Sequence, residues 1–510
     1  MVSGAGRNVL HADPKPSAAQ RRISVTGLIT LGLFGCVSAK AASPETQTQL
    51  YLSTTPQAAS PATSLAIPIE PTETYLASGT SDGYLFNLRP LGSDLGGLLA
   101  DHGVYLVGKS VSEEMGAVAG GIKRGGFYEG YAVAGIDFDL QRIVDMRGGS
   151  LHFLLSDLQG QAFYNYTGST YANNRVYAST PAFRLNELSY EQELFGGSAD
   201  VRLGRIPAYT QFDGSELYCT FVTDLCRTPA AYTFDRGSPS YLASSWAAIG
   251  EMRLTNTIYA HAGIYENEPI LAQSNHGGFP GPDWSLNYAN GATVPAEIGY
   301  RTTIENDQYP RTYSVGGFYS TGRYADPLLN SANHNRILSG GSARMDTGLS
   351  LIFVQGQQMV YRPDSSDRGL TLFGGADWAA SGQPVIERMI FGGTYWKGPI
   401  KSRPRDTIGI AISYTAVNSR ITERVNSLLS RTDGGQASRG EISYQAYYGV
   451  AVAPGFLIKP FVEFISHPDQ ASSARPSGNN THAVIAGTLL EIDAAALLGL
   501  STLVHKAFSS

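Results

Sequence analysis

The chain contains little charge, little cysteine and no long apolar run in its main part. Charged residues make up 16% of its 510 residues, whereas soluble globular proteins usually contain about a quarter. The net charge of −6 comes without any basic run, which argues against a protein that binds nucleic acid. After the N-terminal region the best apolar candidate, 494–504, is shorter than the roughly 20 residues of a membrane-spanning helix.

Only three cysteines occur, and Cys36 falls within the N-terminal apolar region. Cys219 and Cys226 remain as an even pair, which in an exported chain favours a disulfide that closes a small loop. Two thiols without a nearby histidine form at most half of a zinc site. We therefore expect no metal site and no cofactor.

The N-terminal segment has the features of an export signal. Arg21-Arg22 precede an apolar run over 25–37, and Ala39-Lys40-Ala41 has the form of a cleavage site. A first transmembrane helix is the alternative, but the run is too short for one. We expect a signal peptide over 1–41, followed by a flexible leader rich in Ala, Ser, Thr and Pro over 42–74.

Glycine and tyrosine are abundant, with 58 and 29 residues, and apolar residues alternate with polar ones. Near the C-terminus one face carries Ile442 and Tyr444, whereas the other carries Glu441 and Gln445. Successive side chains of a strand point to opposite faces, so this alternation predicts two-faced strands. Sixteen strand-like segments follow one another along the chain: 103–109, 131–140, 148–156, 184–194, 199–206, 245–254, 257–265, 294–303, 312–321, 347–357, 369–378, 387–396, 406–415, 440–452, 455–465 and 481–492.

The connections between these segments alternate in length. Those over 157–183, 207–244 and 266–293 are long and polar, whereas 195–198 and 255–256 are short. This pattern predicts an all-β protein, a 16-stranded antiparallel transmembrane β-barrel with long external loops and short periplasmic turns. A sheet in lipid must close because its edges cannot pair with water, and sixteen strands leave room for an aqueous channel. A soluble β-sandwich or a solenoid is the alternative that shows the same alternation.

The sequence resembles the carbohydrate-selective porins of Gram-negative bacteria, the OprB-like family. The resemblance is carried by the order of several short pieces along the chain. These pieces are LRPL (88–91), 94–103, GGIK (120–123), YEG (128–130), DFDL (137–140), GGSLH (148–152), RLNELSYEQ (184–192), RLGR (202–205), Tyr218-Cys219, Phe221, Cys226, Pro229, RDTIG (405–409), 441–460 and Pro468.

The resemblance implies a channel in the outer membrane of a Gram-negative bacterium that passes sugars by diffusion and carries out no catalysis. It implies a barrel over 103–510 after a short periplasmic segment over 75–102. It also implies that the third external loop, 207–244, enters and narrows the lumen, so that a Cys219–Cys226 disulfide would stiffen it. The expected partners are sugars, outer-membrane lipid and lipopolysaccharide. Association as a homotrimer is left open, and no nucleic acid is expected.

Candidate pore-lining residues come from inward strand faces and from the constricting loop. Carboxylates, guanidinium groups and aromatic rings can bind the hydroxyls and apolar faces of a sugar, weakly enough for it to leave. The candidates are Glu187, Glu191, Arg202, Asp213, Glu216, Tyr218, Trp246, Arg253, Glu441, Lys459 and Glu463. The alternative for each is a solvated wall residue or one arm of a structural ion pair. Arg205 shares a strand face with Val201 and Leu203, so we expect a structural role for it.

Catalytic alternatives fit the sequence less well. Glu187, Glu191 and Glu193 share one strand, whereas a glycosidase needs two carboxylates that face each other across a cleft. His152 and Ser156 are too far apart along a strand for a nucleophile and its base. Two functional alternatives stay open: a general diffusion pore for small solutes, and a secreted sugar-binding or hydrolytic β-protein.

Overall fold

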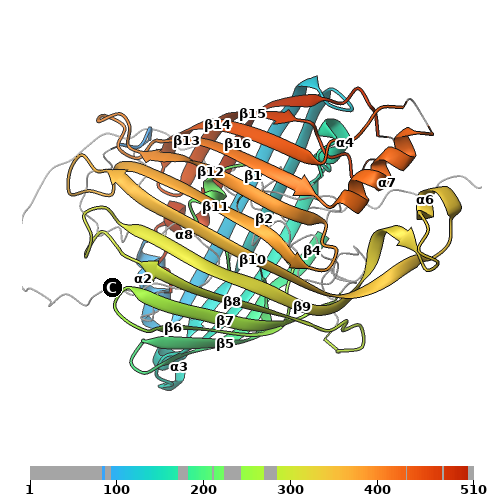
Figure 1. The fold of residues 1–510 in the computed structure, drawn as a ribbon. Coiled ribbons are helices and arrows are strands. Elements are labelled where there is room, and N and C mark those ends of the chain that lie inside the picture. The colour runs from blue at the N-terminus through green and yellow to red at the C-terminus, as the bar shows by residue number, and fades with distance from the viewer. Residues whose placement is uncertain are drawn as a thin grey trace, which may run out of the picture. The chain divides into compact units, whose positions relative to one another are not determined.

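The fold was analysed in a computed structural model (Figure 1). It describes residues 83–86, 93–170, 182–208, 212–222, 225, 243–268, 284–431, 434–471, 473 and 476–503. The chain divides into two units, Met1–Pro56 and Gln57–Ser510, and all the described residues belong to the second. The expected signal peptide and leader therefore lie outside the described residues and remain predictions.

Sixteen antiparallel strands form one closed barrel in which each strand pairs with its neighbours in sequence. β1 and β16 close the ring, with Lys109 opposite Asp493 and Gly120 opposite Ala483. The predicted fold class is confirmed. The strands are β1 Val104–Gly120, β2 Gly125–Asp139, β3 Gly149–Gly160, β4 Ala182–Leu194, β5 Ala199–Ile206, β6 Ser245–Arg253, β7 Ile258–Glu266, β8 Ala292–Arg301, β9 Arg311–Asn330, β10 Ala343–Tyr361, β11 Gly369–Ser381, β12 Ile386–Lys397, β13 Thr407–Val417, β14 Gly440–Ala453, β15 Phe456–Ser466 and β16 His482–Asp493.

The two faces of the barrel wall follow the predicted alternation. In β14 and β15, Glu441, Gln445 and Glu463 are buried on the inward face, whereas Tyr444 and Val462 are exposed on the outward face. An apolar outer face suits lipid, and a polar inner face suits water or polar protein groups. The alternation therefore sets which side chains can reach the lumen.

Glycines on the inner wall make room for aromatic rings. Gly409 of β13 stands opposite Tyr447 of β14, and a Cβ atom on Gly409 would lie 2.2 Å from the Tyr447 ring and 2.9 Å from the ring of Phe221. Gly393 stands opposite Phe373 in the same way, and a Cβ atom on Gly393 would lie 2.5 Å from the Phe373 ring. These glycines let the rings lie flat against the wall, where a segment inside the barrel can pack on them.

The connections differ from the prediction at two places. β1 continues to Gly120 and β2 begins at Gly125, so the expected long connection 110–130 is a tight turn. β9 and β10 also extend well beyond the expected strands, so the expected gap 322–346 shrinks to 331–342. We call the end of the barrel that carries 161–181, 207–244 and 418–439 the long-connection rim, and the other end the short-turn rim.

Short helices lie before, between and after the strands. They are α2 Ser93–Asp101, α3 Leu140–Val144, α4 Tyr164–Thr167, η1 Tyr218–Thr220, α6 Arg336–Ser339, α7 Ser419–Leu429 and α8 Ala494–Leu498. Within the described ranges none of the helices is long and apolar enough to cross a membrane. α6 lies in the connection of the extended β9–β10 hairpin, near α7 at the long-connection rim (Figure 1). Asp326 of β9 accepts hydrogen bonds there from Arg344, at 2.8 Å, and from Arg420.

Both chain ends of the barrel unit contact the short-turn rim. The N–H groups of Leu85 and Phe86 donate to the carbonyl oxygens of Ala451 and Val452, at 3.1 and 2.9 Å. Gly96 of α2 lies so close to Leu500 that a Cβ atom there would be 2.8 Å from the Leu500 Cα atom. The expected periplasmic segment 75–102 is thus described over 83–86 and 93–102, and these parts adjoin the end of β14 and the C-terminal segment.

Candidate functional site: the barrel lumen

A chain of buried charged groups crosses the inner faces of β2 to β5. His152 of β3 contacts Asp137 of β2 through Nδ1 at 2.8 Å and Glu191 of β4 through Nε2 at 3.4 Å. Arg202 of β5 donates to Glu191 Oε2 from Nε at 2.9 Å and from Nη2 at 2.5 Å, and to Glu187 Oε1 from Nη1 at 3.2 Å. Buried charges are stable only when they are paired in this way.

The arrangement of these buried side chains pairs each charge with an opposite one. Arg202 lies between two carboxylates of one strand, because Glu187 and Glu191 are four residues apart and point to the same face. Both carboxylates and the guanidinium group have side chains at most 1% exposed. The sequence prediction placed these three residues on the inner wall, and the structure brings them together as one ion-pair network.

Segment 212–222 belongs to the connection 207–244, the expected third external loop, which we call the third long connection. It lies along another part of the inner wall. The Phe212 ring stacks on His261 of β7 at 3.9 Å between centroids, and the Tyr218 ring contacts Phe373 and Phe391 of β11 and β12 at 5.4 and 5.1 Å. The Val222 N–H donates to the Gln445 side chain of β14 at 3.0 Å. These contacts follow the wall from β7 to β14.

Polar contacts hold the first half of the same segment. The Asp213 N–H donates to Glu297 Oε2 of β8 at 3.0 Å, and the Ser215 hydroxyl donates to Gln357 of β10 at 2.6 Å. The Asp213 carboxyl group is buried near the negative groups Asp377 of β11 and Glu297 of β8. Burial, together with the negative groups Asp377 and Glu297, raises the pKa of Asp213 well above its ordinary value.

A second ion-pair group lies towards the short-turn rim. Lys109 of β1 and Lys459 of β15 both contact Glu491 of β16, at 2.7 and 3.1 Å. The Lys459 ammonium also lies 5.7 Å from the centre of the Tyr447 ring, a cation–π contact. One carboxylate thus lies between two ammonium groups, and Asp493 stands opposite Lys109 as a second acidic group.

Comparison with known proteins identifies the family. The model of the carbohydrate-selective porin, OprB family, matches residues 123–504. The chain belongs to this family. It is 24% identical over 376 residues to Porin B of Pseudomonas aeruginosa, which covers 70% of this chain and 81% of that protein. It is also 21% identical over 361 residues to the putative porin QuiX of Acinetobacter baylyi, covering 66% of this chain and 78% of that protein.

The fold is that of solved porins. The high-pH structure of Pseudomonas putida OprB superposes with a TM-score of 0.70 at 21% identity, covering 81% of this chain and 99% of that chain. Family membership and barrel architecture make the protein an outer-membrane carbohydrate porin. The lumen described above is therefore the place where its solutes meet the chain.

Two of the predicted pore residues do not reach this lumen site. Trp246 lies on the face of β6 opposite to buried Glu251, is 37% exposed, and donates its indole N–H to the Trp284 carbonyl at 3.2 Å. The structure therefore places Trp246 on the outer face of the OprB-family barrel, against the prediction. Arg253 lies at the end of β6, where it donates to the Gly197 carbonyl of a short turn at 3.0 Å, away from segment 212–222.

Glu441 and Glu463 point inward, but their contacts differ. Glu441 Oε1 accepts from the Ser169 hydroxyl at 2.5 Å, and Oε2 accepts from the Asp469 N–H at 2.9 Å. Glu441 thus joins two long connections at the rim of the barrel. Glu463 accepts a hydrogen bond from the Ser443 hydroxyl, whereas its Oε2 atom is buried without a partner in the described chain.

The remaining predicted residues belong to the third long connection. Asp213 and Tyr218 are buried between the segment and the wall, and Glu216 is half-buried at the start of the turn that leads into η1. Cys219 is buried in η1, and Cys226 lies outside the described residues. The pairing of these two cysteines stays a prediction.

Arg205 stands opposite Trp246 of β6, and its guanidinium group lies 5.9 Å from the centre of the Trp246 ring. It is 1% exposed, whereas Leu203 is 48% exposed. Arg205 donates to the Ser244 carbonyl at 2.5 Å and lies 3.6 Å from Glu268. These contacts suit the structural role expected for it.

The sequence prediction missed several charged groups of the lumen. Asp137, His152, Lys109 and Glu491 complete the two ion-pair groups, and each sits at a position of inward parity that the sequence alone could have shown. Arg184 of β4 is buried too, and its Nε atom has no hydrogen-bond partner in the described chain. Within the described ranges no cluster of three or more His, Cys, Asp or Glu side chains could hold a metal ion.

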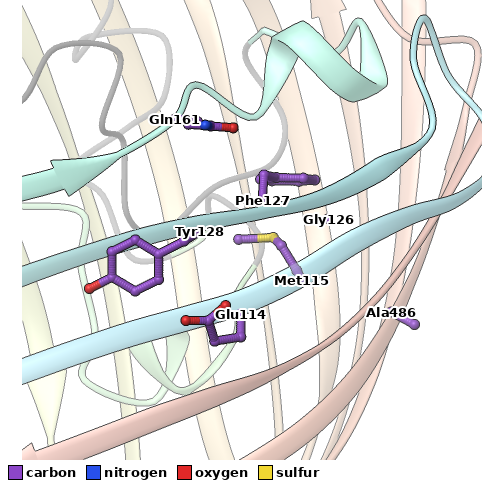
Figure 2. Close-up of a pocket in the computed structure, with 7 residues that line it drawn as sticks. All are labelled: Glu114, Met115, Gly126, Phe127, Tyr128, Gln161 and Ala486. Atoms are coloured by element: carbon purple, nitrogen blue, oxygen red, sulfur yellow. The ribbon is translucent and has the colours of Figure 1, made fainter.

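A hollow of about 530 Å³ lies on the outer side of the wall rather than in the lumen. Figure 2 shows Glu114 of β1 beside Tyr128 of β2, with Ala486 of β16 at its edge. The two residues pair across the strands, and the Ser112 and Tyr128 hydroxyls are 3.4 Å apart. Polar groups thus interrupt the outer face here.

Proposed function

We propose that the protein lets mono- and oligosaccharides diffuse passively through a water-filled lumen that the third long connection narrows. The observation that carries this proposal is the division of the inner wall. Segment 212–222 packs on the wall from β7 to β14, whereas the charged network around Arg202 occupies the wall from β2 to β5. A solute would pass between the segment on one side and this wall of paired charges on the other.

Such a passage suits neutral polyols. Arg202, Glu187 and Glu191 balance one another's charge and are at most 1% exposed, so they fix the wall and its charge balance and do not themselves bind the sugar. The Nε atom of Arg184, which has no partner in the described residues, is a possible donor to a sugar hydroxyl on the same wall. Transport requires binding that is weak enough for release.

A disulfide between Cys219 and Cys226 would stiffen the segment. The structure contains Cys219 in a disulfide-bonded state, which supports this pairing. A covalent link within the third long connection restricts the conformations that this connection can adopt. The aperture would then vary less from moment to moment than with an unlinked loop.

No covalent step is part of this function. Glu187 and Glu191 are both engaged by Arg202 and lie side by side, so they cannot act on opposite faces of a glycosidic bond. His152 is held between Asp137 and Glu191 rather than next to a serine nucleophile. The charged groups are better suited to transient hydrogen bonds than to hydrolysis.

We also propose that the barrels associate as homotrimers within outer-membrane lipid and lipopolysaccharide. The polar interruption of the outer face at Ser112, Glu114 and Tyr128 supports this assembly, because lipid tails cannot pair with a carboxylate. The molar mass of the detergent-solubilised protein, measured by light scattering, should be that of three chains. A Glu114→Leu variant that stays trimeric would contradict a role of this face, and a wild-type monomer would contradict the assembly.

Liposome swelling tests the transport proposal. Proteoliposomes should swell faster in a monosaccharide than in an amino acid of similar size, and more slowly as the oligosaccharide lengthens. Equal rates for sugars and amino acids of one size would support the alternative, a general diffusion porin. Swelling no faster than that of empty liposomes would contradict both.

A further inference from the structure

An apolar groove of about 740 Å³ crosses the outer face of the barrel over β12 to β16. These five strands are neighbours in the sheet (Figure 1). Gln445 and Glu463 alternate with groove residues along β14 and β15 and are buried on the lumen side, so the groove opens toward lipid. Its walls are large outward side chains, all of them exposed: Ile410, Ile412, Tyr444, Val462 and Phe464.

Strand register gives this groove its shape. One row across the wall consists of residues that pair directly on successive strands: Gly392, Ile412, Tyr444, Phe464 and Val484. Gly392 of this row and Ala446 of the next are small residues that leave room between the larger side chains. Four strand spacings of about 4.8 Å make the row about 19 Å long. A hollow of this length between branched and aromatic side chains suits a hydrocarbon chain.

The groove runs obliquely and reaches the long-connection rim at one end. Gly392 lies in the middle of β12, whereas Phe464 and Val484 lie close to the ends of β15 and β16 at that rim. Strands of a barrel are tilted, so a row of paired residues climbs across the wall. A chain in the groove would therefore extend from the rim at β15 and β16 into the membrane over β12.

Polar groups surround the rim end of the groove. The His482 ring at the start of β16 stacks on Phe464, with 6.1 Å between the ring centres. The His482 carbonyl accepts a hydrogen bond from the Gly121 N–H at 2.8 Å. Gly121 belongs to the tight turn 121–124 between β1 and β2, so this turn lies directly beside the end of the groove.

The same turn supplies positive charge. Lys123 and Arg124 are both exposed. The Lys123 ammonium lies 5.1 Å from the centre of the Tyr166 ring, and Arg124 forms no ion pair with any other described residue. The neighbouring rim residues 466–467 and 481–482 contain no Asp or Glu. The groove thus ends at two cations that lack a counter-charge on the same part of the rim.

We propose that this groove binds one acyl chain of lipopolysaccharide, and that Lys123 and Arg124 hold a phosphate group of its lipid A part. Apolar contact along the groove and attraction of the headgroup to basic residues would act together. Long connections of such barrels face the outside, where lipopolysaccharide forms the outer leaflet. The inference rests on the proposed function only in its choice of lipopolysaccharide as a partner of the barrel.

A second copy of the chain is the other occupant to test. Ala486, on the same face of β16 as Val484, borders the hollow beside Glu114, so the groove begins next to the face proposed for the trimer. A protein partner would fill the apolar part of the groove. The uncompensated charges of Lys123 and Arg124 favour an anionic lipid instead.

Binding can be measured by native mass spectrometry of the full chain in detergent, titrated with a rough-type lipopolysaccharide of defined structure. The wild type should bind it, and Lys123→Gln/Arg124→Gln should weaken binding by roughly tenfold to thirtyfold. The matched control Arg388→Gln/Lys401→Gln removes the same charge from β12 and from the short-turn rim and should bind as the wild type does. The same lipid without its phosphates should bind the wild type as weakly as the intact lipid binds the double-glutamine variant.

A second pair of variants tests the groove itself. Ala446→Trp places a ring between the groove walls and should weaken binding severalfold, because the acyl chain loses its apolar contacts. Ala296→Trp puts the same ring on the exposed outer face of β8 and should change nothing. Val462→Trp tests the same groove should Ala446→Trp fail to fold. The urea midpoint of each variant verifies that its barrel is intact.

Each result decides one point. Full affinity in Lys123→Gln/Arg124→Gln overturns the phosphate contact, as does a loss confined to Arg388→Gln/Lys401→Gln. Full affinity in folded Ala446→Trp overturns the groove, and so does its conversion to monomers, which would assign the groove to a second copy. Phosphatidylglycerol that binds as tightly overturns the choice of lipopolysaccharide. Liposome swelling does not enter this test, so its failure and a failure of the transport proposal are distinguishable.

Discussion

Arg202 donates two hydrogen bonds to a single oxygen of Glu191, from Nε at 2.9 Å and from Nη2 at 2.5 Å. Its third nitrogen, Nη1, reaches Glu187 at 3.2 Å. One planar guanidinium group thus serves two carboxylates on the neighbouring strand, with almost no exposure to solvent. Lysine cannot reproduce this arrangement, because its ammonium group is a compact point charge.

Replacement of Arg202 should strongly destabilise the barrel. In Arg202→Leu, Glu187 and Glu191 remain buried without their counter-charge, which should cost about 3–5 kcal/mol of unfolding free energy. Arg202→Lys should recover only part of this loss. Urea unfolding in detergent micelles measures it. Arg253→Leu, at a half-buried residue of the short-turn rim, should cost at most about 1 kcal/mol, and equal losses for the two leucine variants would contradict this account.

The sequence predicted the strands well where both faces of the wall are specialised. In β14 and β15 the outward residues are apolar and the inward ones polar, so the alternation is clear. The second half of β1 was missed because its outward face carries Ser112 and Glu114 instead of apolar residues. The extensions of β9 and β10 were missed because polar residues such as Asp326 pair with other side chains there.

The sequence predicted which residues of the candidate site face the lumen, but not which of them form ion pairs with each other. Inward parity correctly placed Glu187, Glu191 and Arg202, whereas their common ion-pair network depends on strand register. Parity with buried Glu251 could have shown that Trp246 faces outward. The burial of Arg205 could not be predicted, because it depends on contacts with Ser244, Trp246 and Glu268 from other segments.

Removal of the predicted disulfide should loosen the third long connection. Cys219→Ser opens a loop of seven residues, and loop-closure entropy gives such a link about 2.5 kcal/mol. We expect a broader distribution of single-channel conductance with a similar mean, since the wall contacts of Tyr218 and Phe221 persist. Reduction of the wild type should have the same effect, and Cys36→Ser should have none. An unchanged distribution after reduction would count against the stiffening role.

Loss of one carboxylate should separate two long connections at the rim. Glu441 accepts hydrogen bonds from Ser169 and from the N–H of Asp469, and Glu441→Gln replaces one acceptor by a donor. Hydrogen exchange should accelerate over 161–170 and 467–471, as for a local loss of about 1–3 kcal/mol. Glu463→Gln is the control, because Glu463 accepts its hydrogen bond from Ser443 of the neighbouring strand and not from a long connection. Equal acceleration in both variants would assign the effect to general destabilisation.

Acid should loosen the short turn that holds Asp307. The Tyr309 N–H, Arg311 and the Thr302 hydroxyl all donate to this carboxylate and hold its pKa below the ordinary value. The stabilisation from these hydrogen bonds is therefore present above about pH 4, the ordinary pKa of an aspartate. It is lost as the pH falls through the lowered pKa of Asp307. Hydrogen exchange over 302–310, corrected for its intrinsic pH dependence, should rise at low pH. Asp307→Asn should abolish this pH dependence, whereas Glu305→Gln should retain it.

The charge of Glu491 should govern the ion preference of the channel near the short-turn rim. It contacts both Lys109 and Lys459, so Glu491→Gln leaves two ammonium groups without their shared carboxylate. One unit charge a few ångströms from a passing ion is worth about 1 kcal/mol in water. The cation-to-anion permeability ratio should fall on the order of two- to fivefold, measured as a reversal-potential shift in a salt gradient. Lys459→Met should shift it the opposite way, and Glu305→Gln should leave it unchanged. If Glu491→Gln and Lys459→Met move the reversal potential in the same direction, the group acts through the shape of the lumen and not through its charge.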